Sequence, residues 1–279
     1  MVAPQGKLDG RTVLISGVAR GQGRSHAVRC AAEGAHIVGF DLCADIKSVP
    51  YPLATAEDLA ETQKLVREAG GAMVARRADV RDRDAVQSVV DEGVAAFGAI
   101  DSAVVNAGIF CGAGPQGNTP GAWHDTIDVN LTGTVHTLEV VVPAIIEAHR
   151  GGSIVITSSG AGLKAMIVSR SATISGYFSY TASKHALVGL MKAYALSLAA
   201  ENIRVNSIHP TGVDTPMIQG QMVRDYFAQN AATSLFRNAM PVEAIAPSDV
   251  TDAVLWLLSN EARYVTGTAL PIDAGSNLM

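Results

Sequence analysis

The stretch Thr12-Val13-Leu14-Ile15-Ser16-Gly17-Val18-Ala19-Arg20-Gly21-Gln22-Gly23 decides the fold. It opens with an apolar run that is typical of a buried strand, and the residues that follow it, 24–32, have a helical pattern. Glycine lets the backbone turn sharply and approach a pyrophosphate, and the start of a helix offers it unpaired N–H groups and a positive dipole end. The sequence therefore predicts a strand, a glycine turn (Gly17, Gly21, Gly23) and a helix that bind a dinucleotide.

A carboxylate follows at the position where such a turn needs one. The second apolar run, His36-Ile37-Val38-Gly39-Phe40, ends on Asp41, which lies 18 residues beyond Gly23. A carboxylate at the end of this strand can accept hydrogen bonds from a ribose diol, whereas an ordinary strand-end Asp would have no ligand. The spacing of Asp41 from the glycine turn favours the interpretation that Asp41 binds the ribose.

Asp41 also bears on which nicotinamide cofactor binds. Its charge would repel the 2′-phosphate of NADP, which favours NAD. Arg20 argues the other way, because a cation beside the glycine turn could hold that phosphate; it could also pair with the pyrophosphate or with solvent. We give Asp41 more weight than Arg20 in predicting NAD, since Asp41 lies at the strand end where the ribose is expected.

Strands and helices alternate along the rest of the 279 residues, which fits one large α/β domain with a doubly wound parallel sheet. A glycine-rich loop is predicted from Gly108 to Gly121. Further helices are predicted at roughly 55–70, 82–97, 122–149, 178–200 and 247–259, with strands near 72–78, 100–105, 152–158, 203–208 and 268–272.

Tyr180 and Lys184 are the candidate catalysts. They lie four residues apart in Tyr180-Thr181-Ala182-Ser183-Lys184, so a helix would place the hydroxyl and the ammonium on one face. A phenol titrates near ~10 and is a poor base at neutral pH. A positive charge roughly 4 Å away is worth about 4 kcal/mol at an effective dielectric near 20, so Lys184 is expected to lower the pKa of Tyr180 into a working range.

With these motifs in place, the chain resembles the classical short-chain dehydrogenase/reductase family over nearly all of its length. The resemblance implies a single-domain Rossmann fold over residues 1–279, with about seven strands. It assigns Asn130 to a relay water, Ser159 to the substrate oxygen, Tyr180 to proton transfer, and Lys184 to the nicotinamide ribose as well as to Tyr180. The cofactor positions that it implies are Gly17, Arg20, Gly21, Gln22, Gly23, Asp41, Leu42, Asp79, Val80, Asn106, Ala107, Gly108, Tyr180, Lys184, Pro210, Gly212, Val213 and Thr215.

Two departures narrow the resemblance. An insert near 43–55, which many members of the family lack, looks like the carveol-dehydrogenase-like, mycofactocin-associated branch, in which it covers a tightly held NAD that a redox partner reoxidises; a surface loop of no special role is the alternative. The gap between Ser159 and Tyr180 is 21 residues, where the family usually has about a dozen. Ser171 or Ser175 could therefore compete for the serine role. Ser159 is preferred because it follows a strongly apolar strand, which is a rigid position.

The family resemblance also implies a substrate lid near 213–240. Its large side chains would suit an apolar, terpenoid-like alcohol, and core or subunit contact is an equally weighted alternative. The residues concerned are Met217, Met222, Tyr226, Phe227, Phe236 and Met240. The family further implies a homotetramer, with dimer contacts through the helices at roughly 122–149 and 178–200.

Composition limits the other function classes. A formal net charge of −5 without a basic stripe does not favour nucleic-acid binding. No signal peptide and no apolar run long enough to span a bilayer are apparent, so a cytoplasmic protein without membrane contact is expected. The three cysteines, Cys30, Cys43 and Cys111, and the seven histidines show no metal-ligand spacing, so reduced thiols and no metal are expected.

The sequence and the resemblance therefore predict hydride transfer between NAD and a secondary alcohol or ketone. The alternative is an NAD-sensing or scaffold protein that keeps the fold without turnover, against which the complete set of Asn130, Ser159, Tyr180 and Lys184 argues.

Overall fold

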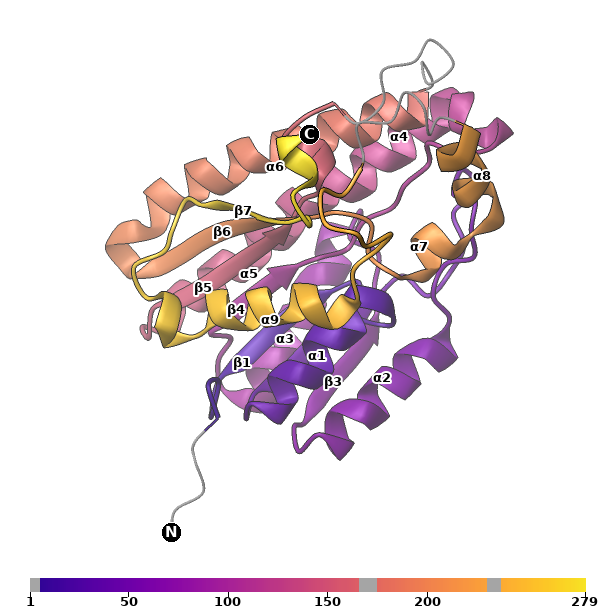
Figure 1. The fold of residues 1–279 in the computed structure, drawn as a ribbon. Helices are drawn as coiled ribbons and strands as arrows, with labels where there is room; N and C mark the ends of the chain where they lie inside the picture. Colours follow the sequence, from indigo (N-terminus) through magenta and orange to yellow (C-terminus); the bar gives the residue numbers. More distant parts are fainter. Residues whose placement is uncertain (1–5, 166–174, 230–236) are drawn as a thin grey trace.

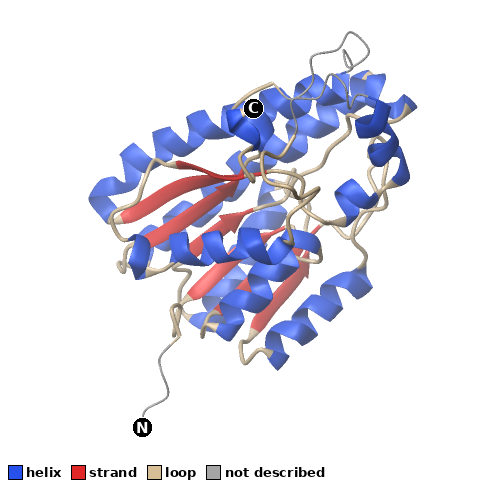
Figure 2. Cartoon of the chain, in the orientation of Figure 1, coloured by secondary structure: helices blue, strands red, loops and turns tan. Residues whose placement is uncertain are grey.

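The computed structural model describes residues 6–165, 175–229 and 237–279. One seven-stranded parallel sheet forms its centre, in the order β3-β2-β1-β4-β5-β6-β7 (Figure 2). The single-domain α/β Rossmann-like fold that the sequence predicts is therefore confirmed. The strands are β1 (Thr12–Ser16), β2 (His36–Asp41), β3 (Met73–Arg77), β4 (Ser102–Val105), β5 (Gly152–Thr157), β6 (Ile203–Pro210) and β7 (Ala269–Ile272).

Helices cover both faces of the sheet (Figure 1). One face carries α1 (Gly21–Ala32), α2 (Ala56–Glu68) and α9 (Pro247–Leu258), and the other carries α3 (Arg83–Phe97), α5 (Gly133–Glu147) and α6 (Ser175–Leu198). Alternate residues of β1 enter the two cores: Val13 and Ile15 pack toward α1 and α9, and Leu14 packs toward α3 and α5. Both cores are apolar, which is why the strands are near-continuous hydrophobic runs.

The direction of strand order reverses between β1 and β4, which pair on either side of the switch. In open α/β sheets a crevice forms at this point beyond the carboxyl ends of the strands. The glycine turn after β1 and the loop after β4 lie there, so the topology itself positions the candidate site.

The helix predicted at 122–149 is interrupted. It consists of α4 (Pro120–Ile127), a π-helical turn (Asp128–Thr132) and α5. A π-turn inserts an extra residue, and such turns are frequent at functional sites. By length and composition alone, the combined segment Pro120–Glu147 is long and apolar enough to cross a membrane, but 56% of its most apolar window is buried in the domain. That burial is typical of a core helix.

Two short helices that the sequence patterns did not reveal follow β6. They are α7 (Pro216–Gln219) and α8 (Gln221–Gln229), and they lie beyond the carboxyl ends of the strands (Figure 1). Helices this short carry too few apolar positions to show a period. They fall within the predicted lid, of which residues 230–236, including Phe236, lie outside the described residues.

Candidate active site

The glycine turn is shaped by close backbone contacts. A Cβ on Gly23 would lie 2.0 Å from the carbonyl oxygen of Gly17, and Gly17 itself has a φ of +68° that side chains disfavour. A Cβ on Gly17 would also lie 2.9 Å from the Cα of Ala107. Only glycine fits at these two positions, so the turn lies flat against the loop after β4.

Asp41 holds the other side of this turn. Its Oδ2 accepts a hydrogen bond from the backbone N–H of Ala19 at 3.0 Å, and its Oδ1 accepts one from the N–H of Cys43 at 3.4 Å. Burial raises the pKa of Asp41, and these N–H groups and the charge of Arg20 oppose the rise. The carboxylate therefore lies at the cleft edge, fixed at the end of β2 as the sequence predicts.

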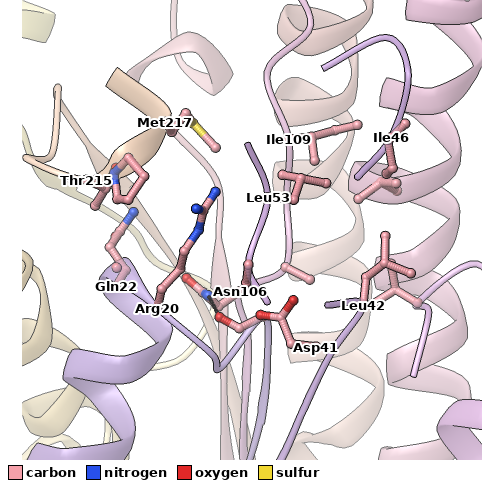
Figure 3. Close-up of a pocket in the computed structure, with 18 of the residues that line it drawn as sticks. Arg20, Gln22, Asp41, Leu42, Ile46, Leu53, Asn106, Ile109, Thr215 and Met217 are labelled. Carbon is pink, nitrogen blue, oxygen red and sulfur yellow. Dashed lines mark hydrogen bonds between the residues drawn. The ribbon is translucent and has the colours of Figure 1, made fainter. Parts of the chain in front are cut away.

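Arg20 takes a role that the sequence left open. Its guanidinium donates to the backbone carbonyl of Pro52, in the insert. Figure 3 shows Arg20 projecting into the cleft, with Gln22 on one side and Asp41 and Leu53 on the other. Arg20 thus bridges the glycine turn and the insert across the mouth of the cleft.

The loops after β3 and β4 complete the cleft. Asp79 is held by the side chain of Arg81 in a two-oxygen contact at 2.7 to 3.0 Å, which lowers the pKa of Asp79 against the effect of burial. The Nδ2 of Asn106 donates to the carbonyls of Ser16 and Gly17 at 3.2 and 3.3 Å. Hydrogen bonds therefore join the glycine turn to the loop after β4, whereas the Asp79–Arg81 pair orders the loop after β3 from within.

The cleft suits a dinucleotide. The predicted cofactor residues that line it are Gly17, Arg20, Gly21, Gln22, Asp41, Leu42, Asp79, Val80, Asn106, Ala107, Gly108 and Thr215. The Oε1 atom of Gln22 is buried and has no hydrogen-bond partner among the described residues. Because a buried acceptor without a partner is costly, this atom is placed to receive a donor from a ligand. Three features of the cleft fit NAD. The glycine turn lets the backbone approach a pyrophosphate, Asp41 is a carboxylate at the expected ribose position, and the Gln22 Oε1 atom is an acceptor without a partner among the described residues.

Tyr180 and Ser159 face each other in a second, adjoining pocket. The Ser159 hydroxyl is close enough to the Tyr180 phenol to lower its pKa, and both residues line the pocket together with Pro210, Gly212, Val213 and Thr215. Ser175 begins α6 and is not among the lining residues; Ser171 lies outside the described residues. Of the two serines that can be compared, Ser159 is the one beside Tyr180.

Lys184 lies beneath Tyr180 and is almost fully buried. Its Nζ donates to the carbonyl of Thr157 at 2.8 Å and lies 5.7 Å from the centre of the Tyr180 ring. Burial lowers the pKa of Lys184 to about 8. The expected lowering of the Tyr180 pKa is not met in this structure, because burial of the phenol raises that pKa and the Ser159 hydroxyl is the group that opposes the rise.

Asn130 lies in the π-turn and is buried. Its Oδ1 accepts from the N–H of Ile109 at 2.8 Å, and its Nδ2 donates to the carbonyl of Ile109 at 2.9 Å. A Cβ on Gly108 would lie 3.4 Å from both the Asn130 Oδ1 and the Lys184 Nζ. Asn130 therefore anchors the loop after β4 through the backbone of Ile109.

The predicted lid residues separate into groups. Met217 lines both pockets, together with Gln22 and Thr215, so the two pockets share a wall. Phe227 lines the second pocket, and Tyr226 packs in the same apolar cluster. The remaining two described residues, Met222 and Met240, are exposed.

The insert lines the cleft and supports a residue of the second pocket. The Ser48 hydroxyl donates to Asp125 of α4 at 2.6 Å, which anchors its first half. The Tyr51 side chain is buried, and its hydroxyl accepts from the N–H of Phe110 at 3.0 Å. Tyr51 lines the cleft, while Phe110 lines the second pocket.

Sequence reasoning missed Phe110 and His209 as site residues. The Phe110 ring meets the Tyr180 ring edge-on, with centroids 5.1 Å apart. The side chain of His209 bonds the carbonyl of Ser159. Neither carries a local pattern, since each acts through residues that are far away in the sequence; the nearest indication for Phe110 is its place just after Asn106-Ala107-Gly108.

The described residues hold no group of three His, Cys, Asp or Glu side chains that could bind a metal. Each of the three cysteines is buried and free.

Comparison with known proteins identifies relatives over the full chain. A family model described as enoyl-(acyl carrier protein) reductase matches residues 17–277. An uncharacterized oxidoreductase of Mycobacterium tuberculosis is 51% identical over 271 residues, covering 96% of both chains. The (−)-trans-carveol dehydrogenase of Rhodococcus erythropolis is 43% identical over 285 residues, covering 98% of this chain and 99% of its own. A crystal structure of carveol dehydrogenase from Mycobacterium avium in complex with NAD superposes with a TM-score of 0.90 at 43% identity, covering 98% of this chain and 100% of that one.

Proposed function

This chain belongs to the classical short-chain dehydrogenase/reductase family and is an NAD-dependent oxidoreductase, and we propose that it transfers a hydride between an apolar secondary alcohol or ketone and NAD. The observation that carries the proposal is the shared wall between the cleft and the pocket of Tyr180 and Ser159. A ligand in the cleft and a substrate in the pocket would meet at Gln22, Thr215 and Met217.

The cofactor would be held by groups from three places in the fold: the end of β2, the glycine turn and α6. Asp41 would accept hydrogen bonds from the adenosine ribose, the glycine turn would approach the pyrophosphate, and Lys184 would hold the nicotinamide ribose. Bound NAD supplies the hydride acceptor for the oxidation and, when reduced, the hydride donor for the reverse reaction.

The protein's own residues would move the proton. As the alcohol carbon loses its hydride and becomes a carbonyl, the Tyr180 phenolate takes the hydroxyl proton and becomes a phenol. The Ser159 hydroxyl would orient the substrate oxygen. Asn130 would position relay water indirectly, since its side chain already bonds Ile109.

The pocket favours an apolar substrate such as carveol, the alcohol named for the Rhodococcus relative. Its walls include the rings of Phe110, Tyr177 and Phe227 and the side chain of Met217. A largely apolar wall beside the hydroxyls of Ser159 and Tyr180 suits a cyclic alcohol whose only polar atom is its hydroxyl. A terpenoid-like alcohol resembling the substrate named for the Rhodococcus relative is our first choice.

Four finer features remain predictions. These are a tightly held NAD, a redox partner that reoxidises it as in the mycofactocin-associated branch, a homotetramer and a cytoplasmic location. The hydrogen bond of Arg20 to Pro52 supports the first, because it closes the insert over the cleft mouth.

Replacement of Tyr180 tests the proposal. Reduced nicotinamide would be measured by absorbance, in single turnovers and with an artificial electron acceptor, on trans-carveol and a panel of cyclic and aliphatic alcohols. Tyr180→Phe should keep NAD binding nearly intact and cut turnover by at least ~10²-fold, whereas Tyr264→Phe, at an exposed tyrosine outside both pockets, should leave turnover unchanged. Near-normal turnover in Tyr180→Phe would remove Tyr180 from the mechanism. A parent protein that binds NAD but reduces none of it with any alcohol would instead support the NAD-sensing or scaffold alternative.

A further inference from the structure

His209 is a buried side chain whose two ring nitrogens are both engaged. Its Nδ1 lies 2.8 Å from the carbonyl oxygen of Ser159, and its Nε2 lies 2.8 Å from the hydroxyl of Ser207. A carbonyl only accepts, so Nδ1 carries the hydrogen and Nε2 accepts from the Ser207 hydroxyl. The bonds therefore fix one tautomer and one ring orientation.

The Ser159 backbone lies just beyond the point where strand pairing stops. The backbone N–H of Ser158 still donates to the carbonyl of Ile208 at 2.9 Å. The next residue of β6 after His209 is Pro210, which has no N–H and so cannot continue the ladder to the Ser158 carbonyl. The Ser159 carbonyl accepts from the N–H of Gly162 at 2.9 Å and from the His209 ring. The His209 ring therefore connects the Ser159 carbonyl to β6 at a point where no backbone hydrogen bond of the ladder does so.

The surroundings keep this ring neutral. Burial lowers the pKa of His209 to about 4, and the charges that face it are those of Lys184 and His185 on α6, which lower that pKa, and of Asp273 after β7, which raises it. At neutral pH the ring is a neutral Nδ1–H donor whose orientation depends on Ser207.

We propose that His209 is a positioning residue for hydride transfer: it holds the Ser159 backbone so that the Ser159 hydroxyl stays on Tyr180 and on the substrate oxygen. This inference rests on the proposed function and adds the pair His209 and Ser207 to it. Neither residue would touch the substrate, since neither lines the pocket.

Loss of the His209 hydrogen bond should alter the pH dependence of alcohol oxidation, which a loss of packing alone would not do. The Ser159 hydroxyl beside Tyr180 opposes the rise that burial causes in the Tyr180 pKa. If Ser159 shifts, that effect weakens and the pKa of Tyr180 rises. The alkaline rise in alcohol oxidation should then move to higher pH.

Three variants separate the effects of the Nδ1–H donor, of the orientation of the His209 ring and of the side-chain volume at position 209. His209→Leu removes the donor and keeps an apolar side chain. His209→Asn restores an amide N–H near the position of Nδ1, and Ser207→Ala keeps the ring but removes its orienting hydroxyl. A distant matched substitution, His149→Asn, controls for the loss of a histidine on an exposed loop after α5.

His209→Leu should lower kcat by about tenfold or more, because small misplacements of a positioning group cost heavily in rate, and should shift the pH profile upward. His209→Asn should recover most of the rate, Ser207→Ala should be intermediate, and NAD affinity should stay within about twofold in all three. The rates would be measured with the alcohol of the panel that the parent oxidises fastest. Parent-like kcat and pH profile in His209→Leu, or an Asn variant as slow as Leu, would overturn the proposal.

Ser159→Ala distinguishes this inference from the proposed function. If Ser159→Ala is inactive while His209→Leu is normal, only the role of His209 fails; if Ser159→Ala is itself fully active, the proposed role of Ser159 fails. A crystal structure of His209→Leu gives a readout independent of turnover. A displaced Ser159 hydroxyl supports the proposal, and an unmoved one contradicts it.

Discussion

The hydroxyl of Tyr51 accepts a hydrogen bond from the backbone N–H of Phe110 at 3.0 Å. Tyr51 belongs to the insert after β2, and Phe110 belongs to the loop after β4. The Phe110 ring contacts the Tyr180 ring edge-on. The segment predicted to cover the cofactor is therefore also a support for the substrate pocket. A Cβ on Gly220, at the start of α8, would lie 3.1 Å from the Cβ of Tyr51, so the insert and the lid pack together.

Tyr51→Phe should weaken both stability and substrate binding. The change leaves the Phe110 N–H buried without its acceptor, which costs roughly 1 to 3 kcal/mol of unfolding free energy. We expect the KM for the alcohol to rise more than the dissociation constant for NAD, because Phe110 lines the substrate pocket. Denaturant unfolding and steady-state kinetics would check both. Tyr264→Phe, at an 89% exposed tyrosine, is the control and should change neither quantity.

Arg20→Gln should speed NAD release, because the guanidinium no longer bonds the Pro52 carbonyl across the cleft mouth. Excision of residues 44–54 with a short glycine linker should speed it further and permit turnover with free NAD. Closure of a cover acts mainly on dissociation, so the association rate should change little. Exchange of labelled NAD measures the effect, with Lys64→Gln on the exposed surface of α2 as control.

A parent protein that purifies without NAD, or that exchanges it within seconds, would contradict the cover and with it the likeness to the mycofactocin-associated branch.

The parent protein should bind NAD far more tightly than NADP. Asp41→Ala should relax this preference, since it removes both the repulsion of a 2′-phosphate and the acceptor for the ribose. Asp41→Asn separates the two effects, because it removes the charge but keeps a carbonyl that can accept from the Ala19 N–H. Titration of cofactor-free protein decides the matter. Equal dissociation constants in the parent would show that Arg20 outweighs Asp41.

His26 should make the fold sensitive to acid. Its Nδ1 bonds the Thr251 hydroxyl at 2.8 Å, its Nε2 is buried without a partner among the described residues, and burial lowers its pKa from 6.5 to about 3. Because the unfolded chain takes up this proton first as the pH falls below 6.5, protonation favours unfolding. The group alone should remove about 3 kcal/mol of unfolding free energy between pH 7 and pH 4.

Denaturant unfolding across that pH range would measure the loss. His26→Asn, which can still bond Thr251, should flatten the dependence, and an equally steep dependence in that variant would show that other groups cause it.

The sequence alone was sufficient for the order of the seven strands and the longer helices, and for most of the residues that line the cofactor cleft. Gly17 and Gly23 are local requirements of one turn, and Asp41 follows one strand, so each is visible in a short stretch of chain. The helices α2, α3 and α9 likewise begin and end within a few residues of their predicted bounds. Local backbone geometry and hydrophobic period carry this information without any tertiary contact.

Only the tertiary structure decided what surrounds those residues. Arg20 turns to Pro52, 32 residues away in sequence, and Tyr51 bonds Phe110, 59 residues away. The pKa of Tyr180 is governed by burial rather than by Lys184, whose Nζ bonds Thr157. Burial, like these contacts, arises when parallel strands bring distant loops to one edge of the sheet, and no local pattern in the sequence encodes which side chains then meet.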